Sequence, residues 1–139
     1  MNGTGKQNNA VISAAAASAE KFALNGYEVF VDGTIGPWFL EPWLNIAESG
    51  VDVRYIILRP DAPTTVRRAM QRTQREEFPL HSEAVQNIWQ SFQKMDKYEE
   101  NVIDTTNQTV DETVAFVKKH LQNGGFSLMY FPTSSQFHS

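Results

Sequence analysis

The apolar run at residues 53–58 constrains the fold of this chain more than any other sequence feature. The run is nearly continuous, and Arg59-Pro60 ends it. Short continuous apolar runs are typical of parallel strands that are covered on both faces. The run therefore predicts a sheet with helices on both sides.

Helical and strand patterns alternate along the rest of the chain. Further strands are predicted at residues 27–31, 101–104 and 126–131, and helices at residues 10–24, 44–48, 63–77, 82–96 and 110–122. Strands that alternate with helices pair in parallel through right-handed crossovers. The last helix has a clear start, because Thr109 and Glu112 have the spacing of a capping box. We expect a flexible leader at residues 1–9, one domain at residues 10–131 and a polar tail at residues 132–139.

Composition limits the classes of function. The 139 residues suit one domain, and 41% hydrophobic residues are enough for a core. A net charge of −4 gives no electrostatic footprint for nucleic acid or an anionic membrane, and no segment reaches the roughly 18 apolar residues of a membrane span. The chain has no cysteine, which excludes disulfides and thiolate sites and favours a cytoplasmic protein. The three histidines are scattered, so no metal site is expected.

Polar residues follow three of the predicted strands. In parallel sheets, ligands bind beyond the carboxyl ends of the strands. The residues at these ends are therefore the candidates for a functional site. They are Asp32-Gly33, Arg59-Pro60-Asp61 and Asp104-Thr105-Thr106.

An arginine row lies on the helix predicted at residues 63–77. Arg68, Arg72 and Arg75 fall at positions i, i+4 and i+7, so they share one helical face. Guanidinium groups bind phosphoryl oxygens bidentately and stabilise developing charge. The competing interpretation is a solvated basic face that pairs with neighbouring acids such as Glu76.

Two residues near the first predicted strand each have two interpretations. Asp32 is either a carboxylate that holds water on Mg²⁺ or contacts an acceptor, or the first half of a turn-forming Asp-Gly pair. Trp38, with Phe39 and Trp43, either forms a wall for an aromatic or sugar-like acceptor or covers the end of the sheet.

Three phrases of the sequence together resemble a family of small P-loop kinase-like ATPases, related in fold to chloramphenicol phosphotransferase, shikimate kinase and gluconate kinase. The resemblance covers roughly residues 9–128. It implies a partial P-loop NTPase fold of the nucleoside-kinase type, an α/β three-layer parallel sheet without its first two strands. The phrases are Gly26-Tyr27-x-Val29-x-Val31-Asp32-Gly33-x-Ile35-Gly36-Pro37-Trp38-Phe39, Leu58-Arg59-Pro60 with Arg68-Ala69-x-x-Arg72, and Ile103-Asp104-Thr105-Thr106.

The resemblance also implies an activity, which is transfer of phosphate from ATP with Mg²⁺ to a small-molecule acceptor. Arg68 and Arg72 would lead into the lid over the phosphates, and with Asp32 they would act in catalysis. The turn Asp104-Thr105-Thr106 would border the adenine pocket, and together with the two arginines it would bind the nucleotide. Asp32 and Trp38 would contact the acceptor.

The chain departs from this family where the phosphate-binding loop should lie. Gly3-Thr4-Gly5-Lys6 is the nearest match, but no strand precedes it and Gln7 replaces the hydroxyl residue of the motif. An ATP-binding kinase-like domain with impaired catalysis is one interpretation. The alternative is a non-catalytic module, derived from a P-loop kinase, that binds a partner or itself. A third is a truncated gene product without a function of its own.

The missing strands have a structural consequence. In the related kinases the first strand lies between the third and the fourth, which here are residues 27–31 and 53–58. These two segments must pair directly, pair through another chain, or leave an unpaired edge, and unpaired backbone is costly when buried. We therefore expect a rearranged sheet, or a homodimer with strand exchange.

Overall fold

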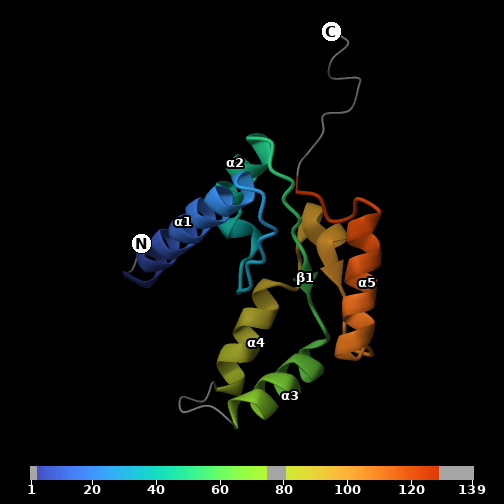
Figure 1. The fold of residues 1–139 in the computed structure, drawn as a ribbon. Helices are drawn as coiled ribbons and strands as arrows, with labels where there is room; N and C mark the ends of the chain where they lie inside the picture. The colour runs from blue at the N-terminus through green and yellow to red at the C-terminus, as the bar shows by residue number, and fades with distance from the viewer. Residues whose placement is uncertain (1–2, 75–80, 129–139) are drawn as a thin grey trace. The chain divides into compact units, whose positions relative to one another are not determined.

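The structure is a computed structural model that describes residues 3–74 and 81–128 (Figure 1). The chain divides into two compact units. The first unit comprises Met1–Arg54 and Ser127–Ser139, and the second comprises Tyr55–Phe126. Among the described residues, no helix combines the length and the apolar character that crossing a membrane requires.

The first unit is built around two helices, α1 (Gly3–Leu24) and α2 (Glu41–Glu48), which contact each other. A short 3-10 helix, η1 (Pro37–Phe39), leads into α2. Helix α1 contributes the buried Ala16, whose small side chain allows close packing of another helix. Four other buried side chains come from α2 and the residue before it, and a fifth, Leu128, follows the bridge at Ser127. The four are Leu40, Trp43, Ile46 and Ala47.

Helix α1 is longer than the sequence predicts but ends where expected. It begins at Gly3 rather than at residue 10, so it includes most of the stretch that we assigned to a leader. At its other end Gly26 has a φ of +88°, a conformation that glycine adopts at low cost, and Asn25 donates from Nδ2 to the carbonyl of Lys21 at 2.8 Å. The predicted end of this helix at residue 24 is therefore confirmed, and Asn25-Gly26 forms the stop.

The strand predicted at residues 27–31 is wrong. These residues belong to no helix or strand, and none of the described residues gives the backbone of residues 28–31 a hydrogen bond. The pattern favours a strand, but a strand exists only when a neighbouring strand pairs with it. The described part of the chain supplies no such neighbour for this segment.

The second unit contains the only sheet in the described ranges, a parallel pair of two-residue strands. Strand β1 (Ile57–Leu58) pairs with β2 (Val102–Ile103), in the register Ile57↔Val102 and Leu58↔Ile103. The parallel pairing is as predicted. Around the pair lie the helices α3 (Ala62–Thr73), α4 (Ser82–Ser91) and α5 (Val110–Gln122), with a 3-10 helix η2 (Asp96–Asn101) before β2 (Figure 1).

The predicted fold class is wrong for the described residues. The sequence suggested an α/β P-loop domain with a three-layer parallel sheet, whereas the structure is mostly helical with one two-stranded sheet. The apolar run at residues 53–58 becomes a strand only at Ile57–Leu58, where β2 lies beside it. Earlier in the run, Arg54 forms an antiparallel bridge with Ser127, and Tyr55 donates its N–H to the carbonyl of Phe126 at 2.9 Å.

The helices of the second unit follow their local signals. In α5, Thr109 accepts from the N–H of Glu112 and Glu112 accepts from the N–H of Thr109, which confirms the capping box. Helix α4 ends at Ser91 rather than at residue 96, and Asp96 has a φ of +52°, which is incompatible with a continuing helix. Helix α3 spans Ala62–Thr73, and residues 75–77 of the predicted helix lie outside the described residues.

The core of the second unit is formed by side chains of both strands, α3 and α4, together with Tyr55 and Met95, whereas α5 contributes no buried side chain. The helical spacing of Val85 and Ile88 predicts one shared apolar face, but only Val85 is buried and Ile88 is exposed. The strand predicted at residues 126–131 is present only as the bridge at Ser127, and residues 129–131 lie outside the described residues. The buried apolar side chains of this unit are Tyr55, Ile57, Ala69, Val85, Met95 and Ile103.

Candidate functional site

The carboxyl ends of β1 and β2 bring two of the predicted strand-end groups together. Because the strands are parallel and in register, the residues that follow them leave the sheet at the same edge. The backbone N–H of Asp61, after β1, donates to Oγ1 of Thr106, after β2, at 2.8 Å. We call this edge, with Arg59, Asp61, Arg68 and the turn Asp104-Thr105-Thr106, the strand-end cluster.

Arg68 reaches this cluster from α3. Its Nη1 donates to Oγ1 of Thr105 at 3.0 Å, and its Nη2 donates to the carbonyl oxygen of Thr105 at 2.9 Å. Longer contacts of Nη2 reach the carbonyls of Thr106 at 3.5 Å and Gln108 at 3.4 Å. Thr105 is buried, so the guanidinium fixes the loop after β2 by satisfying polar groups that water does not reach.

The aspartates of the cluster each accept hydrogen bonds from nearby threonines. Asp104 accepts from both the N–H and the hydroxyl of Thr106, and these bonds lower the pKa of its carboxyl. Asp61 is the N-cap of α3 and accepts from the N–H of Thr64 at 2.8 Å. Hydrogen bonding with the side chain of Thr64, and then with its backbone N–H, lowers the pKa of Asp61. Both carboxylates therefore shape the backbone around them, as in Asx turns and helix caps.

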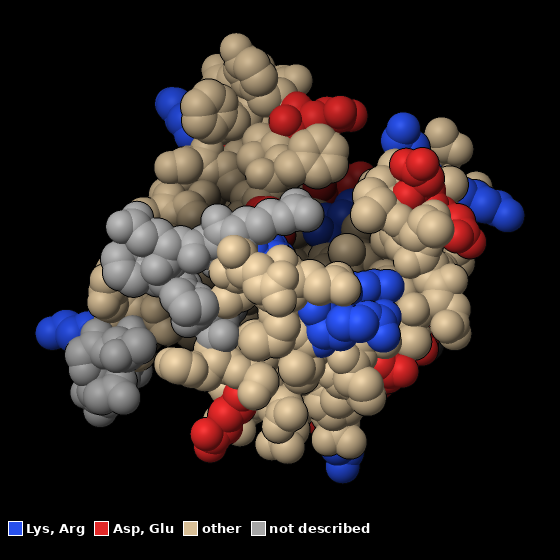
Figure 2. Space-filling model, turned by 90° about the horizontal axis from the view of Figure 1, so that it is seen from below, with Lys and Arg blue, Asp and Glu red and all other residues tan. Residues whose placement is uncertain are grey.

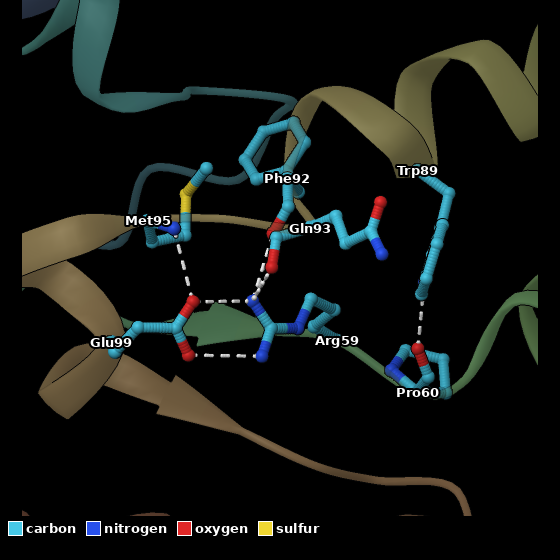
Figure 3. Close-up of polar contacts among 7 residues, drawn as sticks. All are labelled: Arg59, Pro60, Trp89, Phe92, Gln93, Met95 and Glu99. Carbon is cyan, nitrogen blue, oxygen red and sulfur yellow. Dashed lines mark hydrogen bonds and ion pairs between the residues drawn. The ribbon is translucent and has the colours of Figure 1, made fainter.

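Arg59 joins β1 to the end of α4 (Figure 3). Its Nη1 donates to the carbonyls of Phe92 at 2.8 Å and Gln93 at 3.2 Å, and so satisfies carbonyls at the carboxyl end of α4. The sequence leaves two roles open for Arg59, which are contact with a nucleotide and capping of a neighbouring helix end. The structure makes it a cap for the carboxyl end of a neighbouring helix.

Glu99 is the ionic partner of Arg59. The two side chains form a bidentate pair, with Nη1 2.9 Å from Oε1 and Nη2 3.0 Å from Oε2, and Oε1 also accepts from the N–H of Met95 at 3.0 Å (Figure 3). These hydrogen bonds, that of Arg59 above all, lower the pKa of Glu99 to about 2. The hydrogen bond with Glu99 likewise raises the pKa of Arg59. Both side chains retain contact with solvent, so the pair fixes geometry more than it stabilises the fold.

Arg67 and Arg72 are the exposed cations of α3 beside this cluster. Arg72 lies in the last turn of the helix, where positive charge complements the helix dipole. Arg75, the third residue of the predicted row, lies outside the described residues. Figure 2 shows basic side chains gathered in a compact group on the face in view, with acidic side chains near them. An exposed guanidinium group can bind an anion.

Asp32 and Trp38, the other predicted site residues, belong to the first unit. Asp32 is exposed, and 53% of the Trp38 surface is exposed. Trp43 is instead part of the core of that unit. This unit therefore offers a carboxylate and an indole ring to solvent.

The Gly3-Thr4-Gly5-Lys6 segment lies in the first turns of α1. In a P-loop the glycine-rich residues form a loop that leads into the helix, whereas here the chain is already helical from Gly3. Among residues 3–74 and 81–128, no group of three or more histidine or acidic side chains is placed to hold a metal ion.

No family model and no curated protein matches the sequence. The geometry alone therefore bears on function. It shows a strand-end cluster whose main polar groups bind one another, and exposed cations beside it.

Several contacts of this region could not be predicted from the sequence. Glu99 is 40 residues from Arg59, and no local spacing links the two. The helical spacing of Trp89 predicts a core side chain and no polar role, yet its Nε1 donates to the carbonyl of Pro60 at 2.8 Å (Figure 3). Asn101 donates to the carbonyl of Tyr55 at 2.9 Å, across a similar sequence separation. Such contacts depend on how the strands and helices meet.

Proposed function

We propose that this chain is a non-catalytic binding and self-association module, in which residues 27–31 pair with a strand of another chain. The proposal rests on the exposed side chains of this segment and on its backbone, which is unpaired among the described residues. Its apolar side chains are between 39% and 87% exposed, and its backbone from residue 28 to 31 has no hydrogen-bond partner in the described part of the chain. A segment with strand-forming side chains and free backbone groups is a template for intermolecular pairing.

The energetics favour a partner for this segment. Tyr27, Val29, Phe30 and Val31 lie close together, and burying one such side chain stabilises a complex by about 1.5–3 kcal/mol. A second strand would also pair the exposed N–H and C=O groups. Ordering and association costs offset much of this gain, so a weak and concentration-dependent complex is expected.

Hydrogen exchange at two protein concentrations, together with light scattering, tests the proposal. We expect the molar mass to rise with concentration, and the amides of residues 28–31 to exchange more slowly as it does. The amides of the β1–β2 pair serve as an internal reference, because their partner lies in the same chain. A monomeric mass with unprotected amides at every concentration would contradict the proposal.

A matched pair of variants adds a control. Phe30→Ser removes an 87% exposed side chain from the segment, and Val110→Ser removes a 79% exposed one from α5. Neither change opens a cavity, so both variants should fold. Only Phe30→Ser should weaken association.

A second candidate function is binding of a nucleotide at the strand-end cluster. It is favoured by the meeting of Arg68 with Thr105 and Thr106, residues that the resemblance to P-loop kinases assigns to the nucleotide site. On this proposal the exposed Arg72 contacts the phosphates of ATP, carried with Mg²⁺. The absence of cysteine suits a cytoplasmic setting for either function.

Calorimetric titration with Mg-ATP tests the second candidate. We expect the titration to show binding, and we expect the affinity for Mg-ATP to be several-fold lower in Arg72→Ala. This change removes one cation and leaves the contacts of Arg68 in place. Lys94→Ala, which removes an exposed cation outside α3, is the control. No heat at millimolar nucleotide would rule this function out.

A further inference from the structure

The identity and direction of the partner strand can be argued from the segment itself. We infer that residues 27–31 pair with the same residues of a second copy of this chain, in antiparallel orientation, with Val29 opposite Val29. This inference rests on the proposed self-association and adds its partner and register.

The start of the segment is already held in place. The N–H of Tyr27 donates to the carbonyl of Phe22 at 3.1 Å, and the two rings meet edge to face with centroids 5.6 Å apart. The end of α1 therefore fixes where the segment leaves the helix. From residue 28 onward its backbone groups are available for pairing, and their side chains are exposed.

Charge favours the antiparallel arrangement. Glu28 is the only charged residue among residues 27–31. In a parallel, in-register pair, Glu28 would stand directly opposite Glu28 of the second copy, and like charges in that position are destabilising. In the antiparallel pair centred on Val29, Glu28 stands opposite Phe30 of the second copy.

The apolar side chains favour the same arrangement. In an extended strand Tyr27, Val29 and Val31 share one face, because successive side chains alternate. Antiparallel pairing about Val29 places Tyr27 opposite Val31 and Val29 opposite itself. All the side chains on that face of the two-stranded ribbon are then apolar, and an aromatic side chain stands opposite a β-branched one, a favourable cross-strand pair.

The register is consistent with the commonest oligomer symmetry. A two-fold axis through the Val29 pair relates the copies, so each residue of one copy meets its reciprocal partner in the other. This two-fold symmetry relates two copies only, so the contact forms a dimer. The contact is small compared with a standard interface of about 1,600 Å², so the dimer should be weak and reversible.

Because the chain has no cysteine, single cysteines report the register directly. Residues directly opposite in an antiparallel pair have Cα atoms about 4.5–5.5 Å apart, which lies within the range that a disulfide spans. Residue 27 of one copy would lie four positions from residue 27 of the other, or roughly 13 Å along the strand. A disulfide cannot bridge that distance.

The experiment uses four single-cysteine variants of the full chain, oxidised gently and separated without reductant. They are Tyr27→Cys, Val29→Cys, Val31→Cys and, as a control for random collision, Val110→Cys. We expect Val29→Cys to cross-link with itself about tenfold faster than Val110→Cys, because pairing raises the effective thiol concentration. Mixed Tyr27→Cys and Val31→Cys should form the heterodimer faster than either homodimer.

The outcomes separate this inference from the function on which it rests. Equal self-cross-linking at positions 27, 29 and 31 would indicate a parallel pair and overturn the register, while self-association would stand. The amides of residues 28–31 could become protected with concentration while no cysteine variant cross-links faster than the Val110→Cys control. That result would show that the segment pairs with something other than the same segment of a second copy. A wild-type protein that stays monomeric, with unprotected amides, would instead overturn the proposed function itself.

Discussion

At the scale of single residues, the polar side chains of the strand-end cluster are joined by specific, mutually satisfied contacts. Arg68 organises the loop after β2, and Arg59 connects β1, the end of α4 and Glu99. Sequence reasoning placed Arg68 with Thr105 and Thr106 through resemblance alone. It could not have found Glu99, because the pair depends on the three-dimensional path between residues far apart in the chain.

Replacing Arg68 should loosen the loop after β2. Arg68→Lys keeps the charge but loses the forked geometry that reaches both the hydroxyl and the carbonyl of Thr105. We expect a loss of about 1 kcal/mol in the free energy of unfolding, measured by urea denaturation. Arg67→Lys, one position away on an exposed part of the helix, is the matched control and should change stability little. Equal effects of the two changes would contradict the structural role of Arg68.

Glu99 should make stability depend on pH in the acid range. Its pKa is lowered from an ordinary 4.5 to about 2, chiefly by the hydrogen bond from Arg59. The stabilisation is therefore fully present above about pH 4.5 and is lost as the pH falls toward 2. Urea unfolding of wild type and Glu99→Gln at a series of pH values should show a smaller loss in the variant over this window. Parallel curves of unfolding free energy against pH for the two proteins would show that the Arg59–Glu99 pair does not contribute to stability.

At the scale of helices and strands, sequence patterns that act locally predict structure better than patterns that depend on a distant partner. The start of α5 and the stop of α1 were predicted correctly, because a capping box and an Asn-Gly pair act within a few residues. The strands at residues 27–31 and 53–58 were predicted from side-chain pattern, which cannot show whether a neighbour is present to pair with. The second became a strand only where β2 accompanies it.

The capping box of α5 yields a test at this scale. Thr109→Ala removes the hydroxyl that accepts from the N–H of Glu112, and should cost about 1 kcal/mol of stability. Thr109→Ser retains the hydroxyl and should lie close to wild type in a urea titration. If the serine variant is as unstable as the alanine variant, the cap is not the cause.

At the scale of the whole molecule, the candidate site could be predicted only in part. The sequence correctly predicted that strands pair in parallel, and hence that the residues after the paired strands share one edge, but it did not predict which two strands pair. It overestimated the sheet, since the described residues contain two short strands rather than a three-layer α/β sheet. A large sheet requires several long strands at once, and a pattern read one segment at a time cannot establish that.

The division into two units predicts two different unfolding behaviours. Trp38 and Trp43 lie in the first unit and Trp89 in the second, so tryptophan fluorescence can follow each unit separately. In Trp89→Phe the signal reports the first unit, which carries residues 27–31. In the double variant Trp38→Phe, Trp43→Phe the signal reports the second.

If residues 27–31 pair between chains, the first unit should unfold at a higher urea concentration as the protein concentration rises. A hundredfold range of concentration can add up to about 2.7 kcal/mol to its stability. The second unit should unfold at the same urea concentration throughout. Identical concentration dependence of both signals would show that the units unfold together.

The loop before η1 contains a close approach between glycine and indole. A Cβ on Gly36 would overlap the ring of Trp38, so only a residue without a side chain fits beneath it. The α protons of Gly36 therefore lie near the face of an aromatic ring, where the ring current shields them. One glycine signal in a proton–carbon NMR spectrum should appear far upfield of the others. That single peak gives a label-free marker of the folded loop, and its return to the ordinary position would register the loss of that loop alone.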